Sequence, residues 1–161
     1  MTATDFDVGG ALERLRPHVL TTPLRRAPSL SALTGCEVYL KLECVQHTGS
    51  FKLRGAMNKL LRLDPATRAR GVVAASSGNH GAGVAYGAAA LGVAAHVFVP
   101  AYTDPARVDT IAALGATVAR FGDDCDLTEA HARSYAAQHD MAYVSPYNLS
   151  LIHISEPTRP Y

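Results

Sequence analysis

A lysine behind a short glycine-containing turn is the residue of this sequence best placed to do covalent chemistry. Lys52 follows Gly49, Ser50 and Phe51, at the start of an expected helix and behind an expected strand. A deprotonated lysine amine attacks aldehydes, and burial beside the positive end of a helix lowers the lysine pKa toward neutrality. The position of Lys52 therefore predicts a nucleophilic amine, although a lysine in isolation is usually a solvated surface residue.

A second segment with chemical potential is Ser76-Ser77-Gly78-Asn79-His80-Gly81, which lies between an expected strand and an expected helix. Exposed backbone N–H groups, the helix dipole and glycines that let a ligand approach together make such a junction an anion site. Taken alone, the junction is more often a plain helix start. Because it occurs 24 residues after Lys52 in a strand-helix-strand context, we predict a binding loop.

The elements around these two segments alternate in a regular way. From residue 36 onward, short β-branched runs alternate with longer amphipathic stretches, a pattern typical of βαβ units around a parallel sheet. The class predicted is therefore α/β. The expected strands are Glu37–Glu43, Val72–Ser76, Ala95–Pro100, Thr117–Phe121 and Ala142–Ser145. The expected helices are Phe51–Leu63, capped by Ser50 and closed by Asp64-Pro65, then Gly81–Leu91, Asp104–Leu114 with Pro105 in its first turn, and Leu127–His139.

Composition excludes several classes of function. A net charge of +1 gives no basic field for nucleic acid, and the apolar stretch Val84–Ala95 is shorter than the roughly 20 residues of a membrane span. The start of the chain does not resemble a secretory signal, so we expect a cytoplasmic protein. Cys36, Cys44 and Cys125 form no metal or disulfide pattern and are expected to be reduced packing residues. No metal-ligand spacing joins the remaining histidines, which are His18, His47, His96, His131 and His139.

The segment from Lys41 to Ala56, Lys-Leu-Glu-Cys-Val-Gln-His-Thr-Gly-Ser-Phe-Lys-Leu-Arg-Gly-Ala, resembles the cofactor-lysine region of fold type II pyridoxal-phosphate (PLP) enzymes. The match is to the threonine/serine dehydratase and serine racemase family, and it runs from about Thr22 to Asn148. It implies three-layer parallel-sheet lobes of the tryptophan synthase β-like type, here truncated. The glycine-rich phosphate loop and the polar partner of the pyridine nitrogen that the family carries further on do not occur in this sequence.

The resemblance also implies roles for individual residues. Lys52 would hold PLP as a Schiff base, Phe51 would pack against the cofactor ring, and Asn79 would hydrogen-bond the 3′ oxygen of the pyridine. Substrate binding would fall to Ser76, Ser77, Asn79 and His80, with Ser77 as a catalytic acid/base opposite the lysine. No metal is implied by these residues.

The activity implied is β-elimination of L-threonine or L-serine to a 2-oxo acid and ammonia by the parent enzyme, which is expected to be a homodimer. Two alternatives stay open: an amino-acid racemase of the same family, and an inactive truncated fragment, which we expect this chain to be. By analogy, residues 1–67 belong to an incomplete large PLP domain and residues 68–148 to a small domain. Strand Glu37–Glu43 would then lack neighbours and leave apolar surface exposed.

Two rival functions fit the residues less well, and one segment does not fit the fold. Gly81, Gly83 and Gly87 miss the Gly-x-Gly-x-x-Gly spacing of a dinucleotide loop, and no Gly-x-Ser-x-Gly elbow of a serine hydrolase is present. Residues 149–161 resemble a translated sequencing adaptor, so we expect the authentic protein to stop near Asn148.

Overall fold

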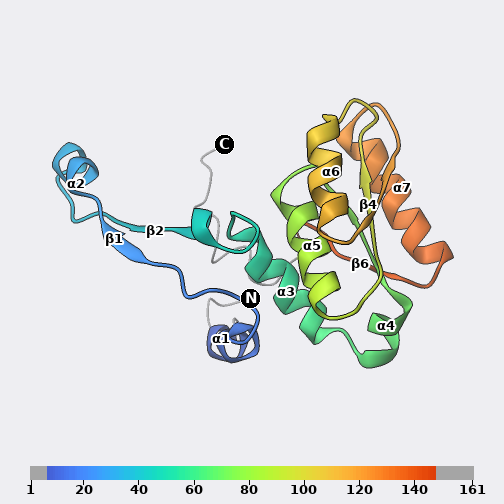
Figure 1. Cartoon of the computed structure of the whole chain (residues 1–161), viewed down its shortest axis with the longest axis horizontal. Coiled ribbons are helices and arrows are strands. Elements are labelled where there is room, and N and C mark those ends of the chain that lie inside the picture. Colours follow the sequence, from blue (N-terminus) through green and yellow to red (C-terminus); the bar gives the residue numbers. More distant parts are fainter. Residues whose placement is uncertain (1–6, 148–161) are drawn as a thin grey trace.

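The computed structural model describes residues 7–147 of the 161-residue chain (Figure 1). The segment 149–161, which we expect to be non-native, lies outside the described residues, and its origin stays a prediction. Within the described chain a four-stranded sheet and its helices form the main body, and a two-stranded hairpin extends away from it (Figure 1).

The main sheet confirms the predicted α/β class. Its strands are β3 (Val72–Ala75), β4 (Ala95–Val99), β5 (Thr117–Arg120) and β6 (Ala142–Tyr143), in the order β5-β4-β3-β6. Every neighbouring pair is parallel. The central strands are valine-rich and buried, as expected for a parallel sheet covered on both faces.

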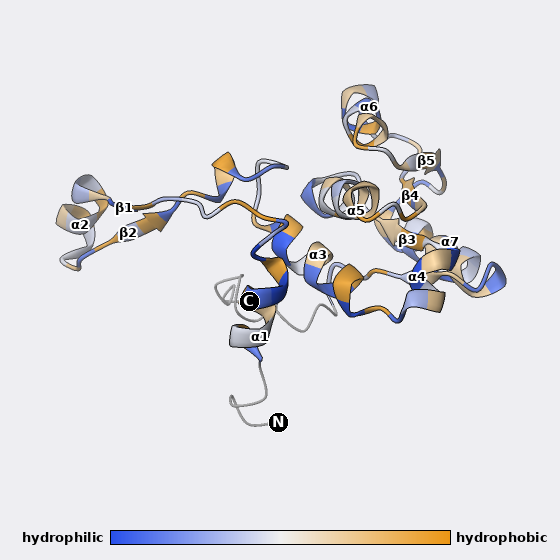
Figure 2. Ribbon diagram, turned by 60° about the horizontal axis from the view of Figure 1, so that its bottom comes forward, coloured by the Kyte–Doolittle hydropathy of each residue, from blue (hydrophilic) through white to orange (hydrophobic). Residues whose placement is uncertain are grey.

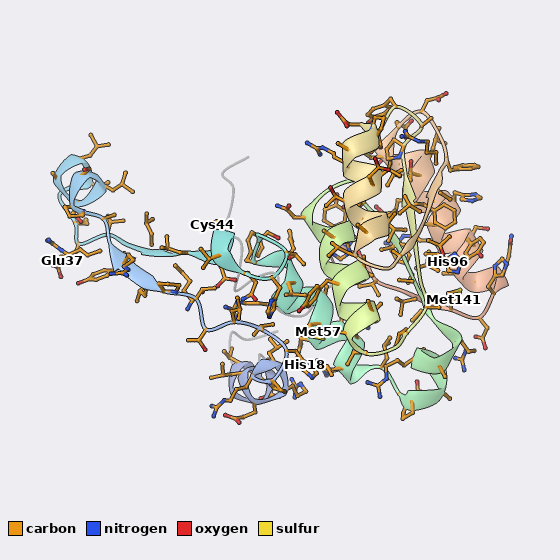
Figure 3. All side chains as sticks on the ribbon, viewed as in Figure 1. His18, Glu37, Cys44, Met57, His96 and Met141 are labelled. Carbon is orange, nitrogen blue, oxygen red and sulfur yellow. The ribbon has the colours of Figure 1, made fainter. Side chains whose placement is uncertain are left out.

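Helices cover both faces of this sheet and make it a three-layer unit. On one face lie α5 (Asn79–Ala90) and α6 (Pro105–Ala113), with α3 (Lys52–Arg62) packed against α5. On the other face lies α7 (Cys125–Gln138), which contacts β3, β4 and β6. Figure 2 shows mostly apolar colouring along β3 and mixed apolar and polar colouring along α3 and α7. Met57 of α3, labelled in Figure 3, is fully buried at the contact with α5.

Local sequence signals explain where several helices begin and end. Asp104 caps α6 through the Ala106 N–H, with Pro105 in the first position as predicted. Asp64-Pro65 closes α3 as predicted, because α3 ends at Arg62. Asp64 also caps a further helix that was not predicted, α4 (Pro65–Arg70), because aspartate followed by proline is a strong helix start.

Ser50 does not cap α3. The N-cap residue is Phe51, and the buried Ser50 hydroxyl has no hydrogen-bond partner in the part of the chain that the structure describes. The turn before α3 therefore leaves a polar atom unsatisfied next to Lys52.

The first third of the chain contains elements that sequence patterns did not predict. These are α1 (Val8–Leu15), β1 (Leu24–Arg26), α2 (Pro28–Thr34) and a 3-10 turn at Glu43–Val45, whereas β2 (Tyr39–Lys41) lies within a predicted strand. The expected strand Glu37–Glu43 is shorter than predicted, and it has a neighbour, since β2 pairs with β1 in an antiparallel ladder.

The β1–β2 hairpin nevertheless exposes apolar side chains, as the truncated domain led us to expect. Leu24 is 63% exposed, Leu33 of the intervening helix 81% and Tyr39 51%. Such a surface favours association or aggregation.

The cysteines differ from the prediction that they are packing residues. Cys36, Cys44 and Cys125 are free, as predicted, but all three are exposed. Figure 3 shows Cys44 on the 3-10 turn, away from the parallel sheet. Among residues 7–147, no helix is long and apolar enough to cross a membrane.

Candidate active site

The backbone of Lys52 is held close to α5. Lys52 is the first residue of α3, its side chain is half-buried, and its Nζ lies 5.0 Å from the centroid of the Phe51 ring. A Cβ added at Gly83 of α5 would lie only 3.2 Å from the Leu53 nitrogen and 3.3 Å from the Lys52 carbonyl carbon. The absence of a side chain at Gly83 therefore permits the close approach that fixes the start of α3.

The predicted binding loop leaves the carboxyl end of β3 and enters α5. The Gly78 N–H donates to the Ser76 hydroxyl at 3.2 Å, and Gly78 is the N-cap residue of α5. A Cβ at Gly81 would collide with the Ser76 carbonyl oxygen, a backbone atom that cannot rotate away. Glycine at position 81 thus allows the helix to start tightly under the loop, with its first N–H groups toward the site.

A pocket of about 310 Å³ brings most of the predicted site residues together. Lys52, Ser76, Ser77, Asn79 and His80 all line it, although Lys52 is 24 residues from the loop in sequence. The remaining lining residues are Ala75, Pro100, Cys125, Thr128, Glu129, Pro146 and Tyr147. Most of these follow the carboxyl ends of parallel strands, where open α/β sheets bind their ligands. Phe51 lies beside the lysine amine and is not among the lining residues.

His80 presents an unsatisfied acceptor in this region. It is 4% exposed, and its Nε2 lies 2.9 Å from the Val144 carbonyl oxygen, so Nε2 must donate. Its Nδ1 is buried without a hydrogen-bond partner among the described residues. Burial, and to a smaller extent the nearby Lys52 charge, hold the pKa of His80 below its usual value, while the bond to Val144 opposes them. The ring is therefore neutral near pH 7, with Nδ1 as a hydrogen-bond acceptor.

The start of α7 forms a wall of the pocket that sequence reasoning missed. The Glu129 carboxylate pairs with Arg133 at 2.6 Å, and the Arg133 guanidinium lies 4.3 Å from the centroid of the Tyr143 ring. Burial, together with the Glu129 charge, raises the pKa of Tyr143 to about 12. The nearby Thr128 hydroxyl lies 2.7 Å from both the Phe121 and the Asp124 carbonyl oxygens. The only sequence signal for this wall is its position after the carboxyl end of β5.

Comparisons with known proteins agree on one family. The family model described as "Pyridoxal-phosphate dependent enzyme" matches residues 15–156, which includes the first part of the segment after Asn148. A biosynthetic L-threonine dehydratase of Mycobacterium leprae is 49% identical over 105 residues, which are 65% of this chain and 25% of that protein.

Solved structures give the same result. The threonine deaminase from T.th. superposes with a TM-score of 0.78 and 38% identity, covering 90% of this chain and 46% of that one. The serine racemase from Dictyostelium discoideum superposes with a TM-score of 0.82 and 33% identity, covering 91% and 48%. The chain therefore spans less than half the length of each of these proteins.

Proposed function

The chain belongs to the family of pyridoxal-phosphate dependent enzymes, and we propose that it is part of a threonine/serine ammonia-lyase in which Lys52 holds the cofactor. The observation that carries the proposal is the shared pocket, in which the Lys52 amine and the Ser76–His80 loop line one cavity. The names of the M. leprae dehydratase and the T.th. deaminase support the choice of reaction.

The residues present fit the cofactor. The pocket joins an amine that can condense with an aldehyde to a helix start that can bind an anion. His80 also lines it, and the buried Nδ1 of His80 has no hydrogen-bond partner among the described residues. Buried polar atoms without partners are uncommon in folded proteins, so the His80 Nδ1 indicates a missing ligand. When bound, PLP supplies the aldehyde and the electron sink for chemistry at an amino acid.

We assign the protein's own contributions as follows. The Lys52 amine holds the cofactor and moves the α-proton of the substrate, and Asn79 orients the cofactor ring. Ser76, Ser77 and the first N–H groups of α5 bind the substrate carboxylate. His80 is neutral with a free acceptor, so we assign it to a substrate N–H or O–H rather than to the carboxylate. Phe51 packs beside the amine that it already contacts.

The substrates that we propose for the complete enzyme are L-threonine and L-serine, which lose the α-proton and the β-hydroxyl as water. The released enamine then adds one water and loses ammonia to give 2-oxobutyrate or pyruvate. Racemisation is the second candidate, because Ser77 lines the same pocket as Lys52 and a serine hydroxyl can serve as an acid/base. The two reactions separate in one assay: elimination releases 2-oxo acid, whereas racemisation leaves the amino acid and changes its chirality.

The test is to mix the chain with PLP, reduce with borohydride and map the modified lysine by mass spectrometry. We expect modification at Lys52 and a PLP absorbance band that disappears in Lys52→Ala. Lys59→Ala is the matched control, since Lys59 lies on the same helix and is also half-buried. A chain that binds PLP equally well without Lys52 would contradict the proposal. Release of 2-oxo acid from threonine by a full-length form then tests the reaction.

A further inference from the structure

A polar network lies behind Lys52, at the start of α3. We propose that the ion pair of Arg54 and Glu43 is a positioning device for the Lys52 amine, with Arg54 as its central positioning residue. The inference rests on the role proposed above for Lys52. It concerns residues that do not line the pocket and that neither the relatives nor the pocket geometry assign to the reaction.

The ion pair has the geometry of a specific contact. Arg54 donates to both Glu43 carboxylate oxygens, from Nη2 at 2.7 Å and from Nε at 2.8 Å. The Thr22 hydroxyl donates to the same carboxylate at 2.6 Å, and Arg54 Nη2 also donates to the Leu20 carbonyl at 3.1 Å. The side chains of Arg54 and Glu43 are only 27% and 15% exposed. A two-pronged pair of this kind fixes orientation as well as distance.

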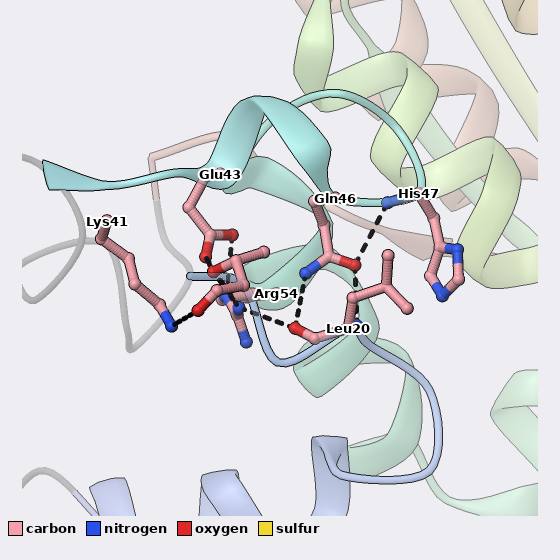
Figure 4. A network of polar contacts seen from close by, with 7 residues as sticks. Leu20, Lys41, Glu43, Gln46, His47 and Arg54 are labelled. Atoms are coloured by element: carbon pink, nitrogen blue, oxygen red, sulfur yellow. Dashed lines mark hydrogen bonds and ion pairs between the residues drawn. The ribbon is translucent and has the colours of Figure 1, made fainter. Parts of the chain in front are cut away.

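Neighbouring bonds extend the network to other parts of the chain (Figure 4). The Gln46 amide accepts from the Leu20 N–H at 2.9 Å and donates to the Leu20 carbonyl at 3.0 Å. Lys41 Nζ donates to the Thr22 carbonyl at 2.6 Å. Three stretches distant in sequence, at residues 20–22, 41–47 and the first turn of α3, are thereby joined. Gln46 and Thr22 are 4% and 3% exposed, whereas Leu20 and Lys41 are exposed, so the network is buried in part.

The electrostatics of Glu43 indicates that its charge needs all of its partners in this network. Arg54 lies in the first turn of α3, where a cation opposes the helix dipole, and Glu43 offsets that cost. Burial raises the pKa of Glu43, but hydrogen bonds from Arg54 and Thr22 and the charges of Arg54 and Lys41 outweigh it and hold the pKa below its usual value. Glu43 is therefore ionised at neutral pH, and loss of one partner leaves a half-buried charge.

The network and α5 hold Lys52 from opposite sides. Residues two apart in an α-helix point about 200° apart around the axis, so Arg54 projects away from the direction of Lys52. On the other side, Gly83 allows α5 to contact the Lys52 and Leu53 backbone. The first turn of α3 is thus clamped between the Arg54 network and α5, and the clamp sets where the amine enters the pocket.

The experiment compares two lysines in the same molecule. The chain is exposed briefly to PLP, reduced with borohydride and digested, and the ratio of modified Lys52 to modified Lys59 is measured. Lys59 lies on the same helix, seven residues from Lys52, so global unfolding affects both amines and leaves no preference specific to Lys52. The variants are Arg54→Met, Arg54→Lys and Glu43→Gln. The control is Arg16→Met, which breaks the exposed Arg16–Glu13 pair.

We expect the ratio to fall by about tenfold in Arg54→Met, since misplacing a reactive group by an ångström costs up to about 100-fold in rate. Arg54→Lys should restore part of it, because the charge remains while the two-pronged contact is lost. Glu43→Gln keeps the size of the side chain, and circular dichroism is used to check its fold. If Arg54→Met does not fold, the modification ratio in Glu43→Gln decides whether the ion pair positions Lys52.

The outcomes separate this inference from the proposed function. A preference for Lys52 in the parent that persists in Glu43→Gln and Arg54→Met overturns the positioning role alone, even if both variants are less stable. Equal modification of Lys52 and Lys59 in the parent overturns the proposed function and the positioning role together. A lower ratio in the network variants, with Arg16→Met unchanged, supports the inference.

Discussion

The contact between α3 and α5 at Gly83 makes a sharp prediction about stability and reactivity. In Gly83→Ala, the new Cβ would lie 3.2 Å from the Leu53 nitrogen, 3.3 Å from the Leu53 Cα and 3.3 Å from the Lys52 carbonyl carbon. All three are backbone atoms of α3. No side-chain rotation relieves the contact, so the start of α3, with Lys52, must shift by a few tenths of an ångström.

The expected change in the free energy of unfolding in Gly83→Ala is the difference of two effects. Overpacking a tight contact costs about 1–3 kcal/mol, and backbone neighbours place this case in the upper part of that range. Replacing glycine by alanine inside a helix returns about 1 kcal/mol. The expected net destabilisation is about 1–2 kcal/mol, which lowers Tm by about 2–8 °C for a chain of this size.

Two other glycines provide a graded comparison. Nothing lies within 4 Å of a Cβ at Gly9 of α1, so Gly9→Ala should be neutral or stabilising by up to about 1 kcal/mol. A Cβ at Gly81 would collide with the Ser76 carbonyl oxygen, so Gly81→Ala should be the least stable of the three. The expected order of stability is therefore Gly9→Ala, then Gly83→Ala, then Gly81→Ala.

The assay combines thermal unfolding by circular dichroism with the ratio of PLP modification at Lys52 and Lys59. Gly83→Ala should lower both Tm and the ratio, because the shift of α3 moves the amine. If Gly83→Ala proves as stable as Gly9→Ala and keeps the parent ratio, the reasoning that α5 fixes Lys52 is refuted.

Three further predictions follow from individual residues. The pKa of Tyr143 is raised from 10.0 to about 12, so the unfolded chain loses this proton first; the free energy of unfolding should fall as pH rises from about 10 to about 12, and an unchanged alkaline titration in Tyr143→Phe would contradict this. The pKa of His80 is lowered from 6.5, so the unfolded chain binds the proton more readily; stability should decline as pH falls below about 6.5, and less so in His80→Gln, as urea titrations at several pH values would measure. Asp104→Ala removes the 2.7 Å cap on the Ala106 N–H and should cost about 0.5–2 kcal/mol in chemical denaturation, with no cost if the cap is irrelevant.

Local signals predicted much of the parallel sheet and its helices. The four short runs predicted from Val72 onward form the strands expected of them, with ends that differ by one or two residues. Periodicity and capping residues act within a few positions of each other, so the sequence alone reveals them. The first third was harder: β1, which is three residues long and exposed throughout, was not predicted, and the strand predicted at Glu37–Glu43 is only three residues long, as β2.

Local signals also misjudged residues whose surroundings come from elsewhere in the chain. Ser50 has the side chain of a helix cap, yet Phe51 occupies that position. Cys125 resembles a small core residue, yet it is exposed at the rim of the pocket. Glu129 and Thr128 carry no motif, and only the return of the chain after β5 places them across from Lys52.

The sequence by itself determined the class of fold, and it predicted the reactive amine at position 52 and the binding loop at Ser76–His80, because a short motif and its spacing are read locally. The tertiary structure alone decided that α7 supplies a wall of the pocket, that His80 Nε2 donates to the Val144 carbonyl, and that Arg54 pairs with Glu43 close to the turn before Lys52. The physical reason is the distance along the chain over which each kind of interaction acts. Helix and strand preferences depend on neighbours a few residues apart, whereas the pocket and the network depend on contacts between residues that only packing brings together.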